Sequence, residues 1–179
     1  MSKIIAIVGG PGTGKTSVIK ELQNRGYNTI KEAAREEIDE AIAGGRTIEE
    51  IRSNPEEFQL AIVRRKIRNE NEWLKRTDQE VVFVDRGMQD TWAYLTFENL
   101  SIARELEGIM NSHKYYKVFL LEELDNYDGE DYARTESPEE ASKIHKLTEQ
   151  AYKRYGMNIE IVPKMSVSKR VDYILSKTF

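Results

Sequence analysis

The sequence predicts an α/β fold, with a mainly parallel sheet that carries helices on both faces. Two observations support this prediction: short apolar runs alternate with longer segments of helical spacing, and the first run leads directly into a glycine-rich loop. The length of 179 residues favours a single domain over 1–179, because two domains of typical size need a longer chain. We expect strands at Ile4–Val8, Tyr27–Ile30, Val81–Val84, Lys117–Leu121 and Asn158–Val162.

The segments between these runs carry the start and stop signals of helices. Thr47–Glu50 has the pattern of a capping box. Asn54–Glu57 and Ser137–Glu140 each combine an N-cap residue, a proline at the first helical position and a glutamate at the third. Gly26 and Gly156 stand where helices are expected to end. The sequence therefore indicates a helix after each of these caps and before each of these glycines.

The glycine-rich loop has the spacing G-x-x-x-x-G-K-T from Gly9 to Thr16, which is the pattern of a phosphate-binding loop. Its glycines allow the backbone N–H groups to turn inward around a polyphosphate. Lys15 supplies a positive charge to the β- and γ-phosphates, and Thr16 offers a hydroxyl to Mg²⁺. The alternative is a glycine-rich turn before an ordinary helix, but the strand, the spacing and the Lys-Thr pair all favour nucleotide binding. We expect the nucleotide to bind Gly10, Pro11, Gly12, Thr13, Gly14, Lys15, Thr16 and Ser17.

Charged residues follow the second and third predicted strands, at the sheet edge where ligands of open α/β sheets bind. Asp85 is placed to hold Mg²⁺, directly or through water, and Arg86 to grip a phosphate or stabilise the transferring charge. The alternative is a pair that ends a strand and caps the next helix. Glu32 is a candidate general base, and Arg35 can orient or bind the acceptor. For these two the alternative is a role as ordinary capping and surface residues.

The segment 122–140 contains nine acidic residues and one basic residue, Arg134, without strong periodicity. This composition predicts a mobile surface loop. A lone arginine in such a loop is often only a surface charge that pairs with its neighbours. However, the segment follows the fourth strand and precedes a helix, where a lid can bring an arginine to the developing charge of phosphoryl transfer. We therefore expect a lid at about 122–140 and a catalytic role for Arg134.

The composition excludes several classes of function. The chain has no cysteine, which excludes disulfides, thiol catalysis and cysteine-ligated metals. Its net charge of −4 gives no general electrostatic case for nucleic acid or an anionic membrane as partner. The N-terminal residues lack a signal-peptide pattern, so we expect a cytoplasmic protein. The glycine spacing also lacks the dinucleotide fingerprint, which argues against hydride transfer.

Three further side chains are expected to have structural roles. His145 has no partner at metal-ligand spacing, so we expect it to face solvent from its helix. Trp92 and Tyr94 can stack on a base, but core packing with a polar tip at the surface is the favoured interpretation.

Several of these segments together resemble a known family. They are similar to the AAA-domain-like P-loop ATPases, small ATPases and kinases related to the nicotinamide-riboside kinase domain of NadR-type proteins. The order of charged residues after the strands also resembles that of deoxynucleoside and thymidylate kinases. The resemblance runs from end to end of the chain. The segments that carry it are Val8–Thr16, Lys31–Arg35, Val84–Gly87 with Asp90 and Ala93-Tyr94, Tyr132–Thr135, Ala151-Tyr152 before Gly156, Val162-Pro163, Ser168 and Arg170-Val171.

This resemblance implies a P-loop NTPase three-layer sandwich. Its five-stranded parallel sheet would have the kinase-like order 2-3-1-4-5, with an arginine lid after the fourth strand. In such kinases the nucleotide base lies between the lid and the loop after the last strand, here around Pro163 to Ser166. The remaining roles that the resemblance implies are the triphosphate on Gly10–Thr16, Mg²⁺ near Thr16 and Asp85, the acceptor among Glu32, Arg35 and Arg86, and Arg134 closing from the lid.

The sequence thus favours a Mg²⁺- and ATP-dependent kinase that acts on a nucleoside, a nucleotide or nicotinamide riboside. The alternative is a nucleotide-binding regulatory ATPase or GTPase that acts through a protein partner. A nucleic-acid 5′-kinase is disfavoured by the acidic segment and the net charge. The candidate catalytic residues are Lys15, Glu32, Asp85, Arg86 and Arg134.

Overall fold

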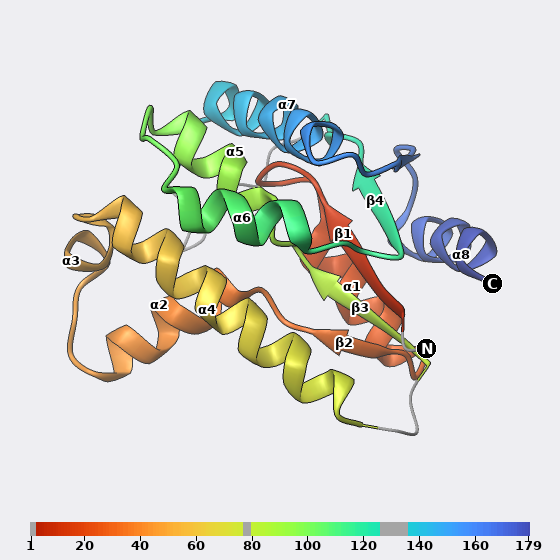
Figure 1. Ribbon diagram of the computed structural model, residues 1–179. Helices are drawn as coiled ribbons and strands as arrows, with labels where there is room; N and C mark the ends of the chain where they lie inside the picture. The colour runs from red at the N-terminus through yellow and green to blue at the C-terminus, as the bar shows by residue number, and fades with distance from the viewer. Residues whose placement is uncertain (1–2, 77–79, 126–135) are drawn as a thin grey trace.

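The computed structural model describes residues 3–76, 80–125 and 136–179 (Figure 1). These residues contain five strands, and each strand begins and ends within one residue of a predicted apolar run. The third strand extends to Asp85, so this acidic residue is the last of its strand. The strands are β1 (Lys3–Val8), β2 (Asn28–Ile30), β3 (Val81–Asp85), β4 (Lys117–Leu121) and β5 (Ile159–Val162).

Helices fill the segments between the strands, as the alternating pattern predicts (Figure 1). No helix in the described ranges is both long and apolar enough to cross a membrane. The helices are α1 (Lys15–Asn24), α2 (Ala33–Ala43), α3 (Ile48–Arg52), α4 (Pro55–Leu74), α5 (Asp90–Phe97), α6 (Arg104–Ser112), α7 (Pro138–Arg154) and α8 (Val167–Thr178).

The strands form one sheet in the order β2-β3-β1-β4-β5, and every pairing is parallel. This confirms the order 2-3-1-4-5. Strand β1 lies at the centre, where Ile7 pairs with Asp85 of β3 and with Phe119 of β4. Because parallel strands end at the same edge, the loop after β1 and the turn after β3 lie next to each other.

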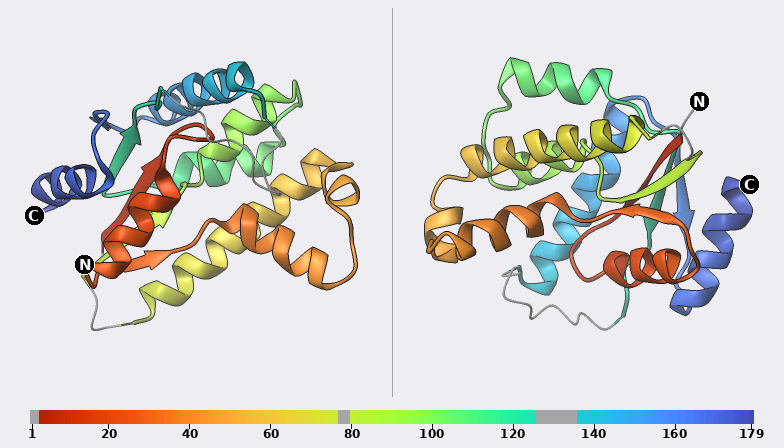
Figure 2. Two further views of the ribbon diagram at one scale, coloured as in Figure 1. Left: turned by 180° about the vertical axis from the view of Figure 1, so that it is seen from behind. Right: turned by 90° about the horizontal axis from the view of Figure 1, so that it is seen from below.

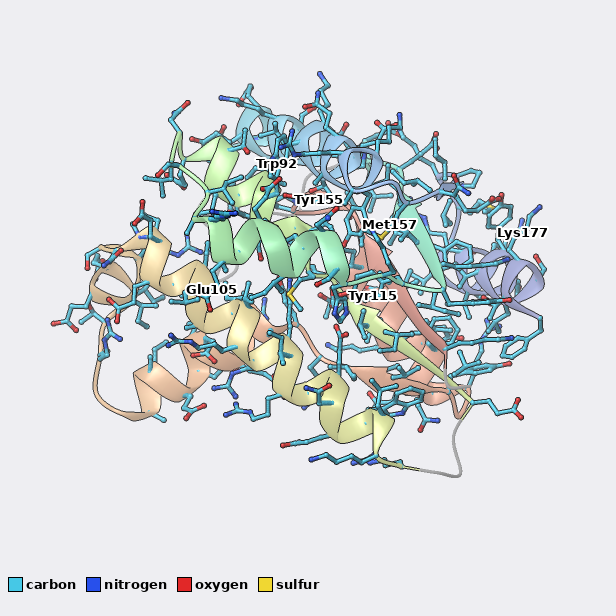
Figure 3. All side chains as sticks on the ribbon, viewed as in Figure 1. Trp92, Glu105, Tyr115, Tyr155, Met157 and Lys177 are labelled. Carbon is cyan, nitrogen blue, oxygen red and sulfur yellow. The ribbon has the colours of Figure 1, made fainter. Side chains whose placement is uncertain are left out.

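The sheet is covered on both faces, which makes three layers. Alternate residues of a strand point to opposite faces, so Ala6 and Val8 pack on one side and Ile5 and Ile7 on the other. The first face packs against α4, α5, α6 and α7, where Tyr115 and the other labelled aromatic residues lie (Figure 3). The second face packs against α1 and α8, which are seen when the molecule is turned by 180° (Figure 2). The predicted three-layer sandwich is confirmed.

The predicted helix signals are formed. Thr47 and Ser137 each make a complete capping box with the glutamate three residues later. The Asn54 side chain accepts a hydrogen bond from the backbone N–H of Glu57. Gly26 and Gly156 follow α1 and α7 with φ of 86° and 70°, in the left-handed region that favours glycine. The helix ends are therefore determined locally by these residues.

Candidate functional site

The phosphate loop connects β1 to α1 in a conformation that requires glycine. Gly12 and Gly14 have φ of 74° and 84°, and Gly14 is the N-cap of α1. At Gly9, a Cβ would lie 2.9 Å from Thr13 Oγ1, so a side chain there would collide with the loop itself. The loop thus places the N-terminus of α1, with its free N–H groups, at the sheet edge.

Lys15 is folded back on the loop. Its Nζ donates hydrogen bonds to the Gly10 carbonyl at 2.6 Å and to Thr13 Oγ1 at 3.3 Å. Burial and the positive charge of Arg86 lower the pKa of Lys15 to about 7, against the raising effect of Asp85. An anion near the loop would favour the charged amine. Thr16, the next residue, is half-buried at the start of α1.

Asp85 ends β3 beside the loop and is buried. Its Oδ1 atom has no hydrogen-bond partner among the described residues. Burial and the negative charge of Glu32 raise the pKa of this carboxyl to about 6, whereas Lys15 opposes the rise. A buried carboxylate oxygen without a partner fits a hard cation such as Mg²⁺, which binds oxygen ligands.

Arg86 connects the phosphate loop to Glu32, which lies between β2 and α2. It has φ of 68°, a left-handed conformation that is uncommon for a residue with a side chain and is often found at functional sites. Its Nε donates to Glu32 Oε1 at 2.6 Å, and its Nη1 donates to the Gly9 carbonyl and to Asp90 Oδ1, both at 3.3 Å. The neighbouring Tyr94 and carboxylates keep the pKa of the buried guanidinium well above its ordinary value, against the effect of burial.

Buried tyrosines hold the turn that follows Arg86. The Gly87 N–H donates to Tyr152 Oη at 3.0 Å and to Asp90 Oδ2 at 3.2 Å, and Tyr152 Oη in turn donates to the same Asp90 oxygen at 2.6 Å. The Met88 N–H donates to Tyr115 Oη at 2.8 Å. A Cβ on Gly87 would lie 2.3 Å from Tyr152 Oη, so this position requires glycine. The tyrosines therefore hold the backbone of the two residues that follow Arg86.

A cavity of about 130 Å³ opens beside Arg86. The predicted residues Glu32 and Arg35 line it from the start of α2, so the structure brings both together with Arg86 as expected. Pro11 of the phosphate loop reaches the same cavity. The other lining residues come from α2, α3, α4 and α5 and from positions 98 and 136: Ala34, Ile38, Arg52, Pro55, Phe58, Gln59, Ile62, Lys66, Asp90, Thr91, Tyr94, Glu98 and Glu136.

Several of these residues were not predicted as site residues. Lys66 is buried, and its Nζ donates to the Gly87 carbonyl at 2.5 Å. Burial lowers the pKa of this amine, against the nearby charge of Asp90. Thr91 is buried too, and its hydroxyl has no hydrogen-bond partner within the described part of the chain. Tyr94 lines the cavity, whereas the sequence favoured core packing for it; Trp92 does pack against the core.

Arg170 of α8 connects the phosphate loop to two other loops at the same edge of the sheet. Its guanidinium donates to three backbone carbonyls, those of Thr13 at 2.6 Å, Glu122 at 3.1 Å and Pro163 at 3.2 Å. These carbonyls belong to the phosphate loop and to the segments after β4 and β5. Arg170 is almost completely buried, and burial lowers its pKa. The family resemblance contained this arginine, but its role in joining three loops has no local sequence signal.

Two predictions about the neighbourhood of the loop have different outcomes. His145 does not simply face solvent, because its Nδ1 accepts a hydrogen bond from the Gly10 N–H at 3.1 Å and the side chain is half-buried. The expectation was wrong because helical periodicity does not show that α7 crosses the phosphate loop.

Arg134 and most of the predicted lid lie outside the described residues. Its role stays a prediction.

Comparison with known proteins shows the family and the fold of the chain. A family model described as an AAA domain matches residues 4–170, which is most of the chain. The chain belongs to this AAA domain family. No curated protein matches this sequence.

Solved structures share the fold of this AAA domain. The NadR protein in complex with NR has a TM-score of 0.76 and 14% identity, matched over 99% of this chain and 50% of the NadR chain. Deoxyadenosine kinase from M. mycoides with bound dATP has a TM-score of 0.67 and 16% identity, over 98% of both chains. Thymidylate kinase from Ehrlichia chaffeensis has a TM-score of 0.68 and 12% identity, over 99% of both chains.

This AAA domain thus spans about half the length of the NadR chain and nearly all of the two kinases. At these identities the likeness shows the fold alone, which this chain shares with the NadR protein, deoxyadenosine kinase and thymidylate kinase.

Proposed function

We propose that this AAA domain is a Mg²⁺-dependent kinase that transfers the γ-phosphate of ATP to a small molecule. The observation that carries the proposal is the cavity beside the phosphate loop. Arg86 contacts both sides, since it bonds to the Gly9 carbonyl of the loop and to Glu32 of the cavity wall. A site for a second substrate next to the γ-phosphate is what a kinase needs and what simple hydrolysis does not.

On the donor side, the loop N–H groups and Lys15 bind the phosphates. Lys15 leaves the Gly10 carbonyl for the phosphate oxygens, where its positive charge is stabilised. The Thr16 hydroxyl and the unpartnered Asp85 oxygen would hold Mg²⁺. The metal ion, when bound, neutralises charge on the phosphates.

On the acceptor side, Glu32 accepts the proton of the attacking hydroxyl as general base. Arg86, fixed between Glu32 and Asp90, stabilises the charge that develops on the transferred group. Arg35 lines the same cavity and orients the acceptor. Arg134, which the sequence places in the lid, completes the charge stabilisation when the lid closes.

The acceptor is a nucleoside, a nucleotide or nicotinamide riboside. The cavity wall combines the aromatic rings of Phe58 and Tyr94 with polar groups of Gln59 and Thr91, which suits a flat ring with polar substituents. The fold neighbours support this class, because the NadR structure is in complex with NR and the deoxyadenosine kinase structure contains dATP.

The proposal is tested by incubating the protein with ATP, Mg²⁺ and a panel of nucleosides, nucleotides and nicotinamide riboside, with products identified by mass spectrometry. We expect one acceptor class to gain a phosphoryl group. Glu32→Gln keeps a hydrogen-bond acceptor for Arg86 but removes the base, so kcat should fall by about 100-fold while nucleotide affinity is kept. Release of ADP with no phosphorylated acceptor would contradict the proposal and favour a regulatory NTPase.

A further inference from the structure

His145 contacts the phosphate loop from α7, the helix that also carries Tyr152. Its Nδ1 accepts the Gly10 N–H at 3.1 Å, although the two residues are 135 positions apart in sequence. The contact is close packed: a Cβ on Gly10 would lie 2.7 Å from His145 Cβ and 2.7 Å from the Ala141 carbonyl oxygen. Helix α7 therefore lies directly on the loop at this residue.

Gly10 is held from two sides. Its N–H donates to His145, and its carbonyl accepts hydrogen bonds from Lys15 Nζ at 2.6 Å and from Thr13 Oγ1 at 3.0 Å. A shift of Gly10 would therefore also disturb its contact with Thr13 and change the path of the loop backbone. His145 is thereby linked to the phosphate loop through the Gly10 backbone.

The contact with Gly10 requires the neutral imidazole. Nδ1 can accept a hydrogen bond only when it carries no proton, so the proton of the neutral ring is on Nε2. Burial lowers the pKa of His145, and the charge of Lys15 on α1 lowers it further. Three carboxylates oppose this effect: Glu122 and Glu123 after β4, and Glu149 on α7 itself.

We infer that His145 is a positioning residue that holds the donor loop through Gly10, and that its protonation weakens nucleotide binding. This inference rests on the proposed function, because it assigns the loop to the ATP donor. When Nδ1 gains a proton, two N–H donors face each other, and Gly10 must move away from α7. The loop then loses the arrangement that presents Lys15 and the N–H groups to the phosphates.

The first test compares two amide variants at about pH 8 by calorimetric titration with Mg-ATP. Asn in His145→Asn places Oδ1 at the same number of bonds from Cβ as Nδ1, whereas Gln in His145→Gln places its oxygen one bond further. We expect the Asn variant to keep the wild-type affinity and the Gln variant to bind about 3- to 10-fold more weakly, the effect of one hydrogen bond. Lys146→Gln, at the exposed neighbouring position, is the control and should not change the affinity.

Comparing the Asn and Gln variants separates the effect of the hydrogen bond to Gly10 from an effect on the stability of α7. Gln favours a helix more than Asn, so a loss of α7 stability would weaken the Asn variant more. Rescue by Asn together with failure by Gln therefore reports the hydrogen bond to Gly10. Equal affinities of the Asn and Gln variants would overturn the inference.

The second test measures the ratio of wild-type to His145→Asn affinity from about pH 8 down to about pH 5.5. The titrations of Asp85 and the nucleotide itself occur in both proteins and cancel in the ratio. Lys15, whose charge acts on His145, has a pKa of about 7 and is charged in both proteins at the acid end of this range. We expect the wild type to lose affinity relative to the Asn variant as the pH falls. A constant ratio would overturn the role of protonation. If the wild type binds no nucleotide at any pH, the proposed function itself fails, which is a separate result.

Discussion

The phosphate loop is a continuous segment, whereas the cavity beside it is assembled from residues between positions 11 and 136. The loop is formed by local contacts, such as Lys15 Nζ on the Gly10 carbonyl. The cavity wall depends on how α2, α4 and α5 pack beside the turn at Arg86. The sequence of the phosphate loop is therefore sufficient to recognise the proposed donor site, whereas the proposed acceptor site depends on the packing of helices. Variants of the two regions should therefore differ. We expect a substitution in the phosphate loop to lower turnover with any acceptor, and a substitution in the cavity wall to change acceptor binding without changing nucleotide binding.

The largest effect is expected at Lys15. Lys15→Ala removes the positive charge that binds the phosphates, so turnover with any acceptor should fall by at least about 100-fold. The measurement is kcat with ATP and the identified acceptor. Lys20→Ala, at an exposed position of the same helix, is the matched control and should leave turnover unchanged. Near-normal turnover of Lys15→Ala would exclude the assigned donor role.

A smaller effect is expected at Tyr152, which supports the turn after Arg86. Tyr152→Phe removes the hydroxyl that bonds to Gly87 and Asp90, so kcat should fall by about 10-fold and unfolding free energy by about 1–3 kcal/mol. Both are measured, together with the nucleotide affinity, which should stay the same. Tyr155→Phe, at the C-cap of the same helix, is the control, because its hydroxyl bonds to Glu107 and not to the turn after Arg86. A stability loss without a change in kcat would make Tyr152 purely structural.

Phe58 tests whether the cavity acts on the acceptor alone. Phe58→Ala removes an aromatic wall, and we expect the acceptor KM to rise by about 10-fold while the nucleotide Kd stays the same. Leu74→Ala, at an exposed position on the same helix, controls for changes in α4. Parallel changes in acceptor KM and nucleotide Kd would show that the two regions are not separate.

The smallest effect is the uptake of a proton by the Lys15 amine when nucleotide binds. The pKa of Lys15 is about 7 in the free protein, so most Lys15 amines are neutral at about pH 8. Phosphates favour the charged amine and raise this pKa, so nucleotide binding should take up nearly one proton. Calorimetry in buffers of different ionisation enthalpy measures this uptake. Lys15→Arg is always charged and should take up none, and equal uptake in both proteins would assign the proton to another group.

The difference between the continuous phosphate loop and the assembled cavity also explains which candidate site residues the sequence could predict. The loop from Gly9 to Thr16 and the pair Asp85-Arg86 were identified because their residues are adjacent and follow apolar strands. Glu32 and Arg35 were identified because the carboxyl ends of parallel strands meet at one edge. The alternation of strands and helices also gave the three layers, and the family resemblance gave the strand order, which the structure confirms.

The remaining site residues depend on tertiary packing. Nothing in the sequence of α4 indicates that Lys66 is buried and that its Nζ reaches the Gly87 carbonyl. In the same way, nothing in the sequence of α7 indicates that His145 lies on Gly10 and Tyr152 beneath Gly87. These contacts join segments that are 21, 135 and 65 residues apart. Only the packing of the helices on the sheet determines them.

The most direct test of the two-substrate site is the fate of the γ-phosphate in one reaction. ATP labelled at the γ-phosphate is incubated with the wild type, Mg²⁺ and increasing acceptor, and the label is measured in the acceptor and in inorganic phosphate. We predict that most of the label enters the acceptor at saturation and that Phe58→Ala needs more acceptor to reach the same share. Label found in inorganic phosphate alone, at a rate that no acceptor changes, would contradict the account.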